Sequence, residues 1–200
     1  MNEKPILFNA EMVNAILSGR KTQTRRIMKV QPENTHLGLR RILESKNSSE
    51  NGKYFWSQSD ACGTKPRSNT FSCPLGQPGD QLWVRETWNK HGGLLTYRAD
   101  HDWIEEMREV AVCPAKWVPS IHMPRWASRI NLLITGVRVE RLNDITEQDA
   151  LAEGVSANEH SPARYVFGSL WQSIYGADNP KSWQANPWVW VIEFERMEAK

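Results

Sequence analysis

A chain of 200 residues, of which 40% are hydrophobic and 24% charged, is long enough for one domain with a hydrophobic core, and this composition argues against disorder. The formal net charge of +2 excludes a general polyanion-binding protein, so any contact with nucleic acid must come from locally clustered charge. No apolar run approaches the roughly 20 residues of a membrane-spanning helix, and we expect no membrane association.

The first expected elements are a short buried strand at residues 5–8 and a helix that begins after Asn9. Asn9 is a favourable N-cap, and apolar residues recur at helical spacing up to Leu17. Gly19 suits the position just beyond a helix end. The basic segment SGRKTQTRR, residues 18–26, therefore begins where the helix stops and the chain must turn.

Residues 31–78 are rich in Asn, Ser, Gly, Lys and Pro and show no strong period, apart from a possible pairing around Tyr54–Trp56. Such a composition is typical of a long loop or an inserted hairpin. We expect a single domain over residues 1–200 in which this insertion is the most mobile and most protease-sensitive part.

The rest of the chain predicts several strands and short helices. Thr146 and Gly154 mark the two ends of one helix, and Gly136 indicates a bulge in the longest strand. The expected strands are 82–88, 94–100, 129–142 and 188–194, and the expected helices lie within ITEQDALAEGV and between Ser161 and Gly176. Together these elements predict an α+β fold, a small and mainly β barrel with helices around it.

The basic segment has two interpretations. A charge run is usually a solvated turn. Alternatively, burial and neighbouring cations lower the pKa of a lysine, so Lys21 could act as a base. Thr24 could then be a nucleophile whose proton Lys21 accepts, provided that the backbone bends, because residues i and i+3 of a regular strand point to opposite faces. The neighbouring cations are Arg20, Arg25 and Arg26.

The same segment contains the pattern G-x-K-x-x-T-x-R, and it resembles the signature of the ASCH domain, a branch of the PUA-like β-barrel superfamily linked to RNA. The turn Gly79-Asp80, the long strand followed by ITEQDALAEG, and the terminal VWVIEF resemble further parts of that family. The whole chain is similar to Trp-rich ASCH proteins found in phages and prophages.

The resemblance implies a PUA-like barrel surrounded by short helices, with an inserted loop region, that handles RNA or a modified nucleoside. Some compact members remove the acetyl group from 4-acetylcytidine with a Lys, a Thr and a Glu, which by motif are Lys21, Thr24 and Glu153. Thr24 would attack the acyl carbon, Lys21 would accept and return the proton, and Glu153 would assist the leaving amine. This route needs no cofactor.

Other members are treated as RNA-binding modules, and a nuclease role is discussed for the family. A non-catalytic RNA-binding module, a nuclease-like protein and a phage accessory protein are therefore alternatives. Trp117 and Trp126, in a loop with Arg125, suit base stacking or phosphate contact, although tryptophan is more often a core residue. Glu86 is the alternative to Glu153 as the acidic residue of the site. It would lie either at a barrel mouth or in an ion pair, for which Arg85 is the suggested partner. The expected substrate or RNA contacts are Arg20, Arg25, Arg26, Arg85, Glu86, Trp117, Arg125 and Trp126.

Cysteine and histidine spacing does not predict a metal site. No C-x-x-C or H-x-x-x-H pattern joins the candidate ligands, so we expect neither a metal nor a cofactor. The odd number of cysteines, with no apolar leader after Met1, argues against a secreted disulfide framework and predicts a soluble cytoplasmic protein. The candidate ligands are Cys62, Cys73, Cys113, His36, His91 and His101.

Overall fold

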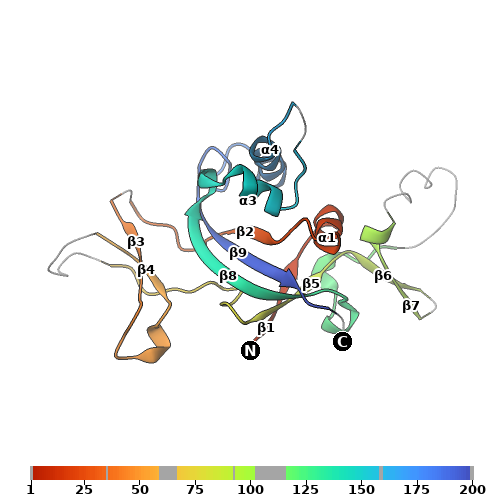
Figure 1. Ribbon diagram of the computed structural model, residues 1–200, viewed down its shortest axis with the longest axis horizontal. Helices are drawn as coiled ribbons and strands as arrows, with labels where there is room; N and C mark the ends of the chain where they lie inside the picture. Colours follow the sequence, from red (N-terminus) through yellow and green to blue (C-terminus); the bar gives the residue numbers. More distant parts are fainter. Residues whose placement is uncertain are drawn as a thin grey trace.

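A five-stranded sheet forms the centre of the molecule in the computed structural model, which describes residues 2–34, 36–58, 67–91, 93–101, 116–157 and 160–198 (Figure 1). The strand order is β1-β5-β8-β9-β2, with β1 parallel to β5 and the other neighbours antiparallel. The strands are β1 (Glu3–Leu7), β2 (Gln23–Ile27), β5 (Gln81–Arg85), β8 (Asn131–Arg141) and β9 (Trp188–Arg196).

The sheet curves strongly along β8 and β9 (Figure 1), but the strand pairings among the described residues leave β1 and β2 as its two edges. Arg26 of β2 donates through Nη2 to the carbonyl of Leu7 at the end of β1, at 2.7 Å, so a side chain spans the seam between the edges. The fold is α+β, as predicted. Closure into a barrel stays a prediction.

The helices follow their predicted caps. Asn9 accepts a hydrogen bond from the Met12 amide at the start of α1 (Ala10–Leu17). Thr146 forms a capping box at the start of α3 (Glu147–Ala152), and α4 (Ala163–Tyr175) ends at Gly176. The described part of the chain has no helix with both the length and the apolar character that crossing a membrane requires.

Strand β9 is buried on both faces, because α3 and α4 cover one side of the sheet and the main core covers the other (Figure 1). The sequence predicted a single apolar face containing Trp190 and Ile192. The structure also buries Val189 and Val191, which pack against α3 and α4. A continuous apolar run is expected for a strand covered on both sides.

Two hairpins project at opposite ends of the molecule (Figure 1). One consists of β3 (Gly38–Arg41) and β4 (Tyr54–Ser57), so the segment 31–78 contains the inserted hairpin rather than only a loop. The other consists of β6 (Trp88–His91) and β7 (Leu94–Tyr97). The strand predicted at 82–88 therefore divides, because β5 ends at Arg85.

The remaining predictions of backbone structure concern short features. The register of β8 against β9 shifts between Ile134 and Gly136, which confirms the predicted bulge. Short 3-10 turns fill several connections: η1 (Ser48–Glu50), η2 (Arg98–Asp100), η3 (Ser120–His122), η4 (Arg125–Ala127) and η5 (Leu142–Asp144).

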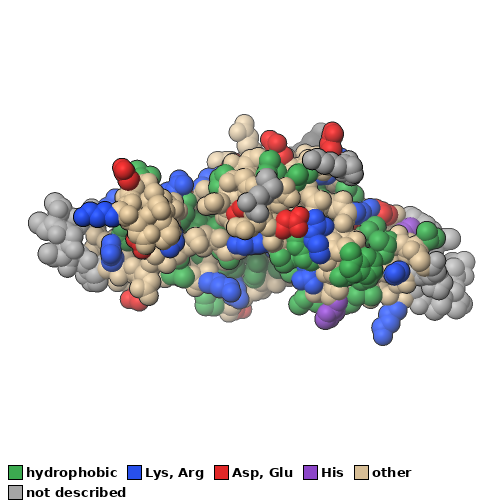
Figure 2. Space-filling model, turned by 90° about the horizontal axis from the view of Figure 1, so that it is seen from below, with side chains coloured by type: hydrophobic (Ala, Val, Ile, Leu, Met, Phe, Trp, Pro, Cys, Tyr) green, Lys and Arg blue, Asp and Glu red, His purple; other side chains and the backbone are tan. Residues whose placement is uncertain are grey.

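On the face shown in Figure 2, Lys and Arg side chains are dispersed among hydrophobic and neutral ones rather than gathered in one patch.

Candidate functional site

Lys21 and Glu153 are brought together by the irregular backbone at two element ends. Lys21 lies between the end of α1 and the start of β2, and its amide donates to the carbonyl of Ala15. Glu153 is the C-cap of α3. The two residues form an isolated antiparallel bridge, so the end of α3 lies directly against the basic segment.

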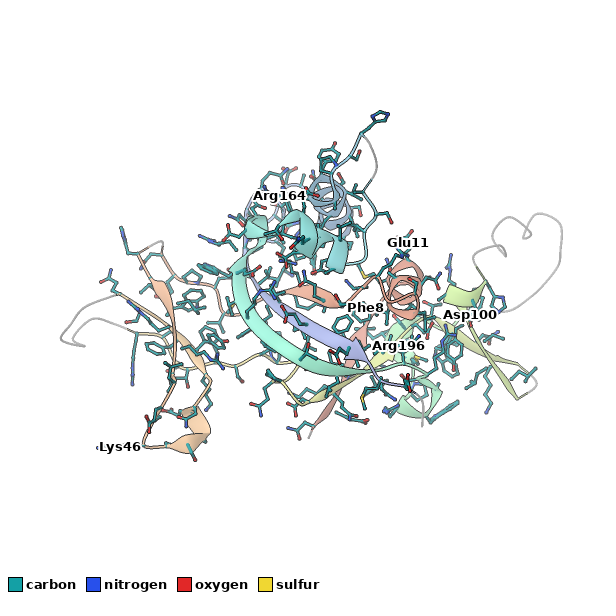
Figure 3. The ribbon with its side chains drawn as sticks, in the orientation of Figure 1. Phe8, Glu11, Lys46, Asp100, Arg164 and Arg196 are labelled. Atoms are coloured by element: carbon teal, nitrogen blue, oxygen red, sulfur yellow. The ribbon has the colours of Figure 1, made fainter. Side chains whose placement is uncertain are left out.

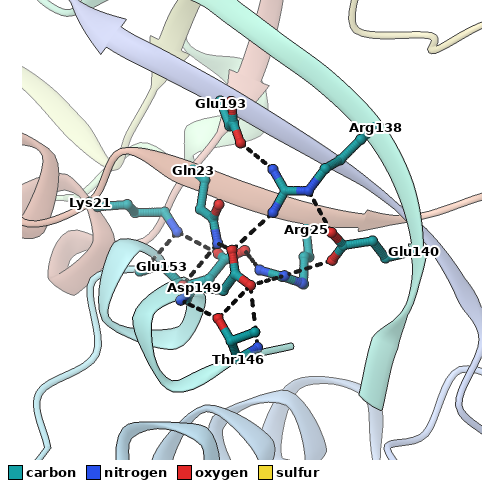
Figure 4. Close-up of polar contacts among 9 residues, drawn as sticks. All are labelled: Lys21, Gln23, Arg25, Arg138, Glu140, Thr146, Asp149, Glu153 and Glu193. Carbon is teal, nitrogen blue, oxygen red and sulfur yellow. Dashed lines mark hydrogen bonds and ion pairs between the residues drawn. The ribbon is translucent and has the colours of Figure 1, made fainter. Parts of the chain in front are cut away.

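The side chains of these two residues form a buried ion pair (Figure 4). Lys21 Nζ donates to Glu153 Oε2 at 2.8 Å and to the Glu153 carbonyl at 2.7 Å. The Lys21 side chain is 0% exposed and that of Glu153 is 4% exposed. Burial lowers the pKa of Lys21 below its ordinary value of 10.5, although Glu153 opposes this shift. The cations Arg26 and Arg25 lower the pKa further, so Lys21 loses its proton more readily than a surface lysine.

Arg25 holds the other oxygen of the Glu153 carboxylate. Its Nη1 lies 3.2 Å from Glu153 Oε1, while Nη2 lies 3.0 Å from Glu140 Oε2 and 3.6 Å from Asp149 Oδ2. The Arg25 side chain is 0% exposed. Its predicted contact with RNA would therefore require this network to open.

The network continues along the sheet to Arg138, which contacts Asp149 at 2.9 Å and also pairs with Glu140 and Glu193 (Figure 4). Gln23 donates from Nε2 to the Asp149 carbonyl at 2.9 Å. These partners were not predicted from the sequence. The available indication was the alternation of charged residues with valines in VRVER of the long strand, where a covered sheet face would leave them half-buried.

Thr24 lies on the opposite face of β2. Gln23 and Arg25 point toward α3, whereas Thr24 pairs with Ile192, whose side chain belongs to the main core. Among the described residues, the Thr24 hydroxyl forms no hydrogen bond with Lys21 or Glu153. The structure thus joins two of the three predicted catalytic residues, and the third, although buried, faces away from that pair.

Phe8, labelled in Figure 3, lies against the two cations that flank Thr24 in sequence. Its ring centroid is 5.6 Å from Lys21 Nζ and 5.2 Å from Arg26 Cζ. Phe8 is buried in the main core and follows β1 directly, so it lies close to the seam between the two edge strands. Phe8 was not among the site residues predicted from the sequence.

Arg20 is exposed and held over the segment that follows Glu153. Its Nη1 donates to the Gly154 carbonyl at 3.1 Å and to Ser156 Oγ at 3.4 Å, and its Nε donates to Ser18 Oγ at 3.2 Å. All three acceptors are neutral. Arg20 is the exposed cation of the basic segment, whereas Arg26 is half-buried and Lys21 and Arg25 are buried.

Glu86 is paired, but not with the partner that was suggested. Both of its oxygens bind Arg129, at 2.9 and 3.0 Å, and its side chain is 1% exposed. Burial raises the pKa of Glu86 above its ordinary value, although Arg129 opposes this. Arg85 instead donates to the carbonyls of Met123 and Ile121. The prediction of an Arg85 partner was wrong because adjacent strand residues point to opposite faces.

The predicted RNA-contacting loop lies on the β6–β7 hairpin and forms a separate cluster there. Trp126 is 62% exposed, packs edge-on against Trp88 at 5.6 Å and has Lys90 Nζ 5.2 Å from its ring centroid. Trp117 is half-buried. Arg125 binds both carboxylate oxygens of Glu3, at 2.9 and 3.0 Å. The structure therefore does not bring this loop onto the Lys21 site.

Metal ligands were not predicted, and within the described ranges no group of three or more His, Cys, Asp or Glu side chains is suitably placed for a metal ion. Cys62 and Cys113 lie outside the described residues, and Cys73 is buried in the core.

Compared with models of known families, with curated proteins and with solved structures, the chain has no match. The likeness to the ASCH domain therefore consists of the sequence motifs alone.

Proposed function

We propose that this chain is an ASCH-type protein of the PUA-like superfamily that handles RNA or a modified nucleoside in the cytoplasm, and that it hydrolyses the amide of 4-acetylcytidine. The supporting observation is the buried pair of Lys21 and Glu153, because two motif positions far apart in sequence meet where solvent is excluded. The Arg26–Leu7 contact across the seam is consistent with a barrel closed by a side chain.

The first step requires a neutral Lys21. In a buried pair, transfer of the Lys21 proton to Glu153 removes both charges, and the lowered pKa of Lys21 favours that transfer. The amine must then turn from Glu153 toward Thr24. Because β2 is an edge strand and Lys21 precedes its regular part, no neighbouring strand among the described pairings blocks that turn.

The acyl transfer then proceeds in two balanced steps. Thr24 Oγ attacks the acetyl carbon and passes its proton to Lys21, the C–N bond breaks, and Glu153 gives its proton to the leaving amine. This leaves acetyl-Thr24 with the ion pair in its charged form. Water then attacks the ester, its proton goes to Glu153, and Lys21 protonates the departing Thr24 oxygen, which releases acetic acid.

The test is release of cytidine from 4-acetylcytidine by purified protein and by Lys21→Ala, Thr24→Ala and Glu153→Gln. Each substitution should abolish turnover, and the Lys21→Ala/Thr24→Ala variant should be hardly slower than either single variant, because the residues act in one step. Since Lys21 and Thr24 are buried, a thermal melt of each variant is a necessary control. No release by folded wild-type protein would exclude this substrate, and activity that persists in Lys21→Ala would exclude this mechanism.

A second candidate is a non-catalytic RNA-binding module, which the exposed ring of Trp126 with its neighbouring Lys90 favours. Affinity for single-stranded RNA should then fall steeply with added salt, and Trp126→Ala should weaken it by about 1–3 kcal/mol. Titration of labelled RNA at two salt concentrations decides this. Equal affinity at both, or no binding at low salt, rejects the module.

A further inference from the structure

A cavity of about 480 Å³ lies between α1, α4 and residues 153–156. This volume falls within the range of roughly 300–1,000 Å³ that is typical of small-molecule sites. Thr24 is not among its lining residues, so the cavity is distinct from the side of the sheet where the proposed acyl transfer takes place. Its apolar wall consists of Met12, Ala15, Val155, Val166 and Leu170.

Arg20 lines the same cavity, and its hydrogen bonds to neighbouring groups orient the side chain. Its three hydrogen bonds go to Ser18, Gly154 and Ser156, and within the described ranges it forms no ion pair with a carboxylate. None of these three bonds uses Nη2. A guanidinium oriented by neutral acceptors keeps its charge and a free donor for an anion, and Arg binds phosphate oxygens with charge-assisted bonds.

The wall of the cavity opposite Arg20 carries a negative charge instead of a positive one. Glu11 lies on α1, on the side that faces the segment after α3 (Figure 3), and lines the cavity together with Asn14. A carboxylate at this point accepts hydrogen bonds from hydroxyl groups and repels an anion. A ligand in this cavity is therefore expected to direct its anionic group to Arg20 and its hydroxyl groups to Glu11.

We propose that this cavity binds a nucleoside monophosphate, with the phosphate on Arg20, the ribose hydroxyls toward Glu11 and the base against the apolar wall. The anionic group is inferred from Arg20 and its surroundings. The choice of a nucleoside as the remainder of the ligand rests on the proposed function. Glu153 lines this cavity and also belongs to the buried ion pair, so a nucleotide bound here lies next to one of the three proposed catalytic residues.

Calorimetric titration at fixed ionic strength with cytidine 5′-monophosphate, cytidine and inorganic phosphate tests the site. The monophosphate should bind at least roughly tenfold more tightly than cytidine, since a hydrogen bond to a charged group contributes about 1.5–3 kcal/mol. Arg20→Gln should remove this difference. Arg40→Gln, which changes an exposed arginine on the β3–β4 hairpin, should retain it.

A second variant tests the apolar wall. Leu170→Trp, at a half-buried position of α4, should fill the cavity and abolish binding of both cytidine and its monophosphate without lowering the melting temperature by more than a few degrees. Equal affinity of the wild type for cytidine and its monophosphate would overturn the proposal, as would a preference that persists in Arg20→Gln. A short RNA that binds while the monophosphate does not would also overturn it.

These outcomes are separable from those of the proposed function. Binding of the monophosphate by a protein that never releases cytidine from 4-acetylcytidine rejects the hydrolase and supports the site. Release of cytidine without any preference for a phosphate-bearing nucleoside rejects the site and leaves the hydrolase intact.

Discussion

Lys21 Nζ and Glu153 Oε2 lie 2.8 Å apart although the two residues are separated by 132 positions in the chain. The contact joins the start of β2 to the end of α3, and neither side chain is more than 4% exposed. A charge that loses its partner here remains buried, so this pair affects stability as well as any chemistry at the site.

Lys21→Met should lower the free energy of unfolding by about 3–5 kcal/mol, because it leaves Glu153 buried with Arg25 as its remaining cation. The double variant Lys21→Met/Glu153→Gln should lose clearly less than the sum of the single losses, since no unpaired carboxylate is left. Urea denaturation monitored by tryptophan fluorescence measures both. Additive losses would show that the two side chains do not interact.

The rate of hydrolysis should fall as the pH rises, with an inflection below 10.5, the ordinary pKa of a lysine. In the proposed reactive form Lys21 and Glu153 share one proton, which Glu153 gives to the leaving amine, and burial lowers the pKa of Lys21 in the folded protein. The pair therefore loses this proton at a lower pH than an exposed lysine does. The measurement is kcat/KM against pH, and an inflection at or above the ordinary value would contradict it.

Gly154→Ala should destabilise the protein far more than Gly79→Ala, although the two glycines have nearly the same φ, +91° and +92°. Strain from positive φ costs about 1–2 kcal/mol at either position. A Cβ on Gly154 would also lie 2.8 Å from Ala15 Cβ and 3.0 Å from Lys21 Cβ, whereas nothing in the described structure lies within 4 Å at Gly79. Thermal melts of the two variants compare them directly, and equal losses of stability would contradict the close packing of Gly154 against Ala15 and Lys21.

Low pH should reduce the free energy of unfolding, partly through protonation of Asp80. The amide of Asn2 donates to Asp80 Oδ1 at 2.9 Å, which lowers the pKa of this carboxyl below its ordinary value of 3.8. Stability from this bond is present above the ordinary pKa and is lost as the pH falls through the lowered one. Asp80→Asn should therefore flatten the loss of unfolding free energy as the pH falls below 3.8. If urea denaturation gives the same loss of unfolding free energy at low pH for Asp80→Asn and the wild type, Asp80 does not contribute to the pH dependence of stability.

Sequence alone predicted the features that depend on near neighbours in the chain. Asn9 caps α1, Thr146 and Asp149 form the capping box of α3, and Gly136 marks the bulge of β8. Each depends on backbone groups within a few residues or on the conformational freedom of one glycine, so the residue type determines the outcome. The mixed α and β character follows from the same local patterns.

Partners across the sheet were decided only by the tertiary structure. The motif placed Lys21 and Thr24 in one site, yet Thr24 faces the main core while Lys21 faces α3. Arg25 is buried among carboxylates of β8 and α3, and Glu86 pairs with Arg129 rather than with its neighbour in sequence. Alternation along a strand shows which residues share a face. Which helix or strand covers that face depends on the order of strands in the sheet, which no local pattern contains.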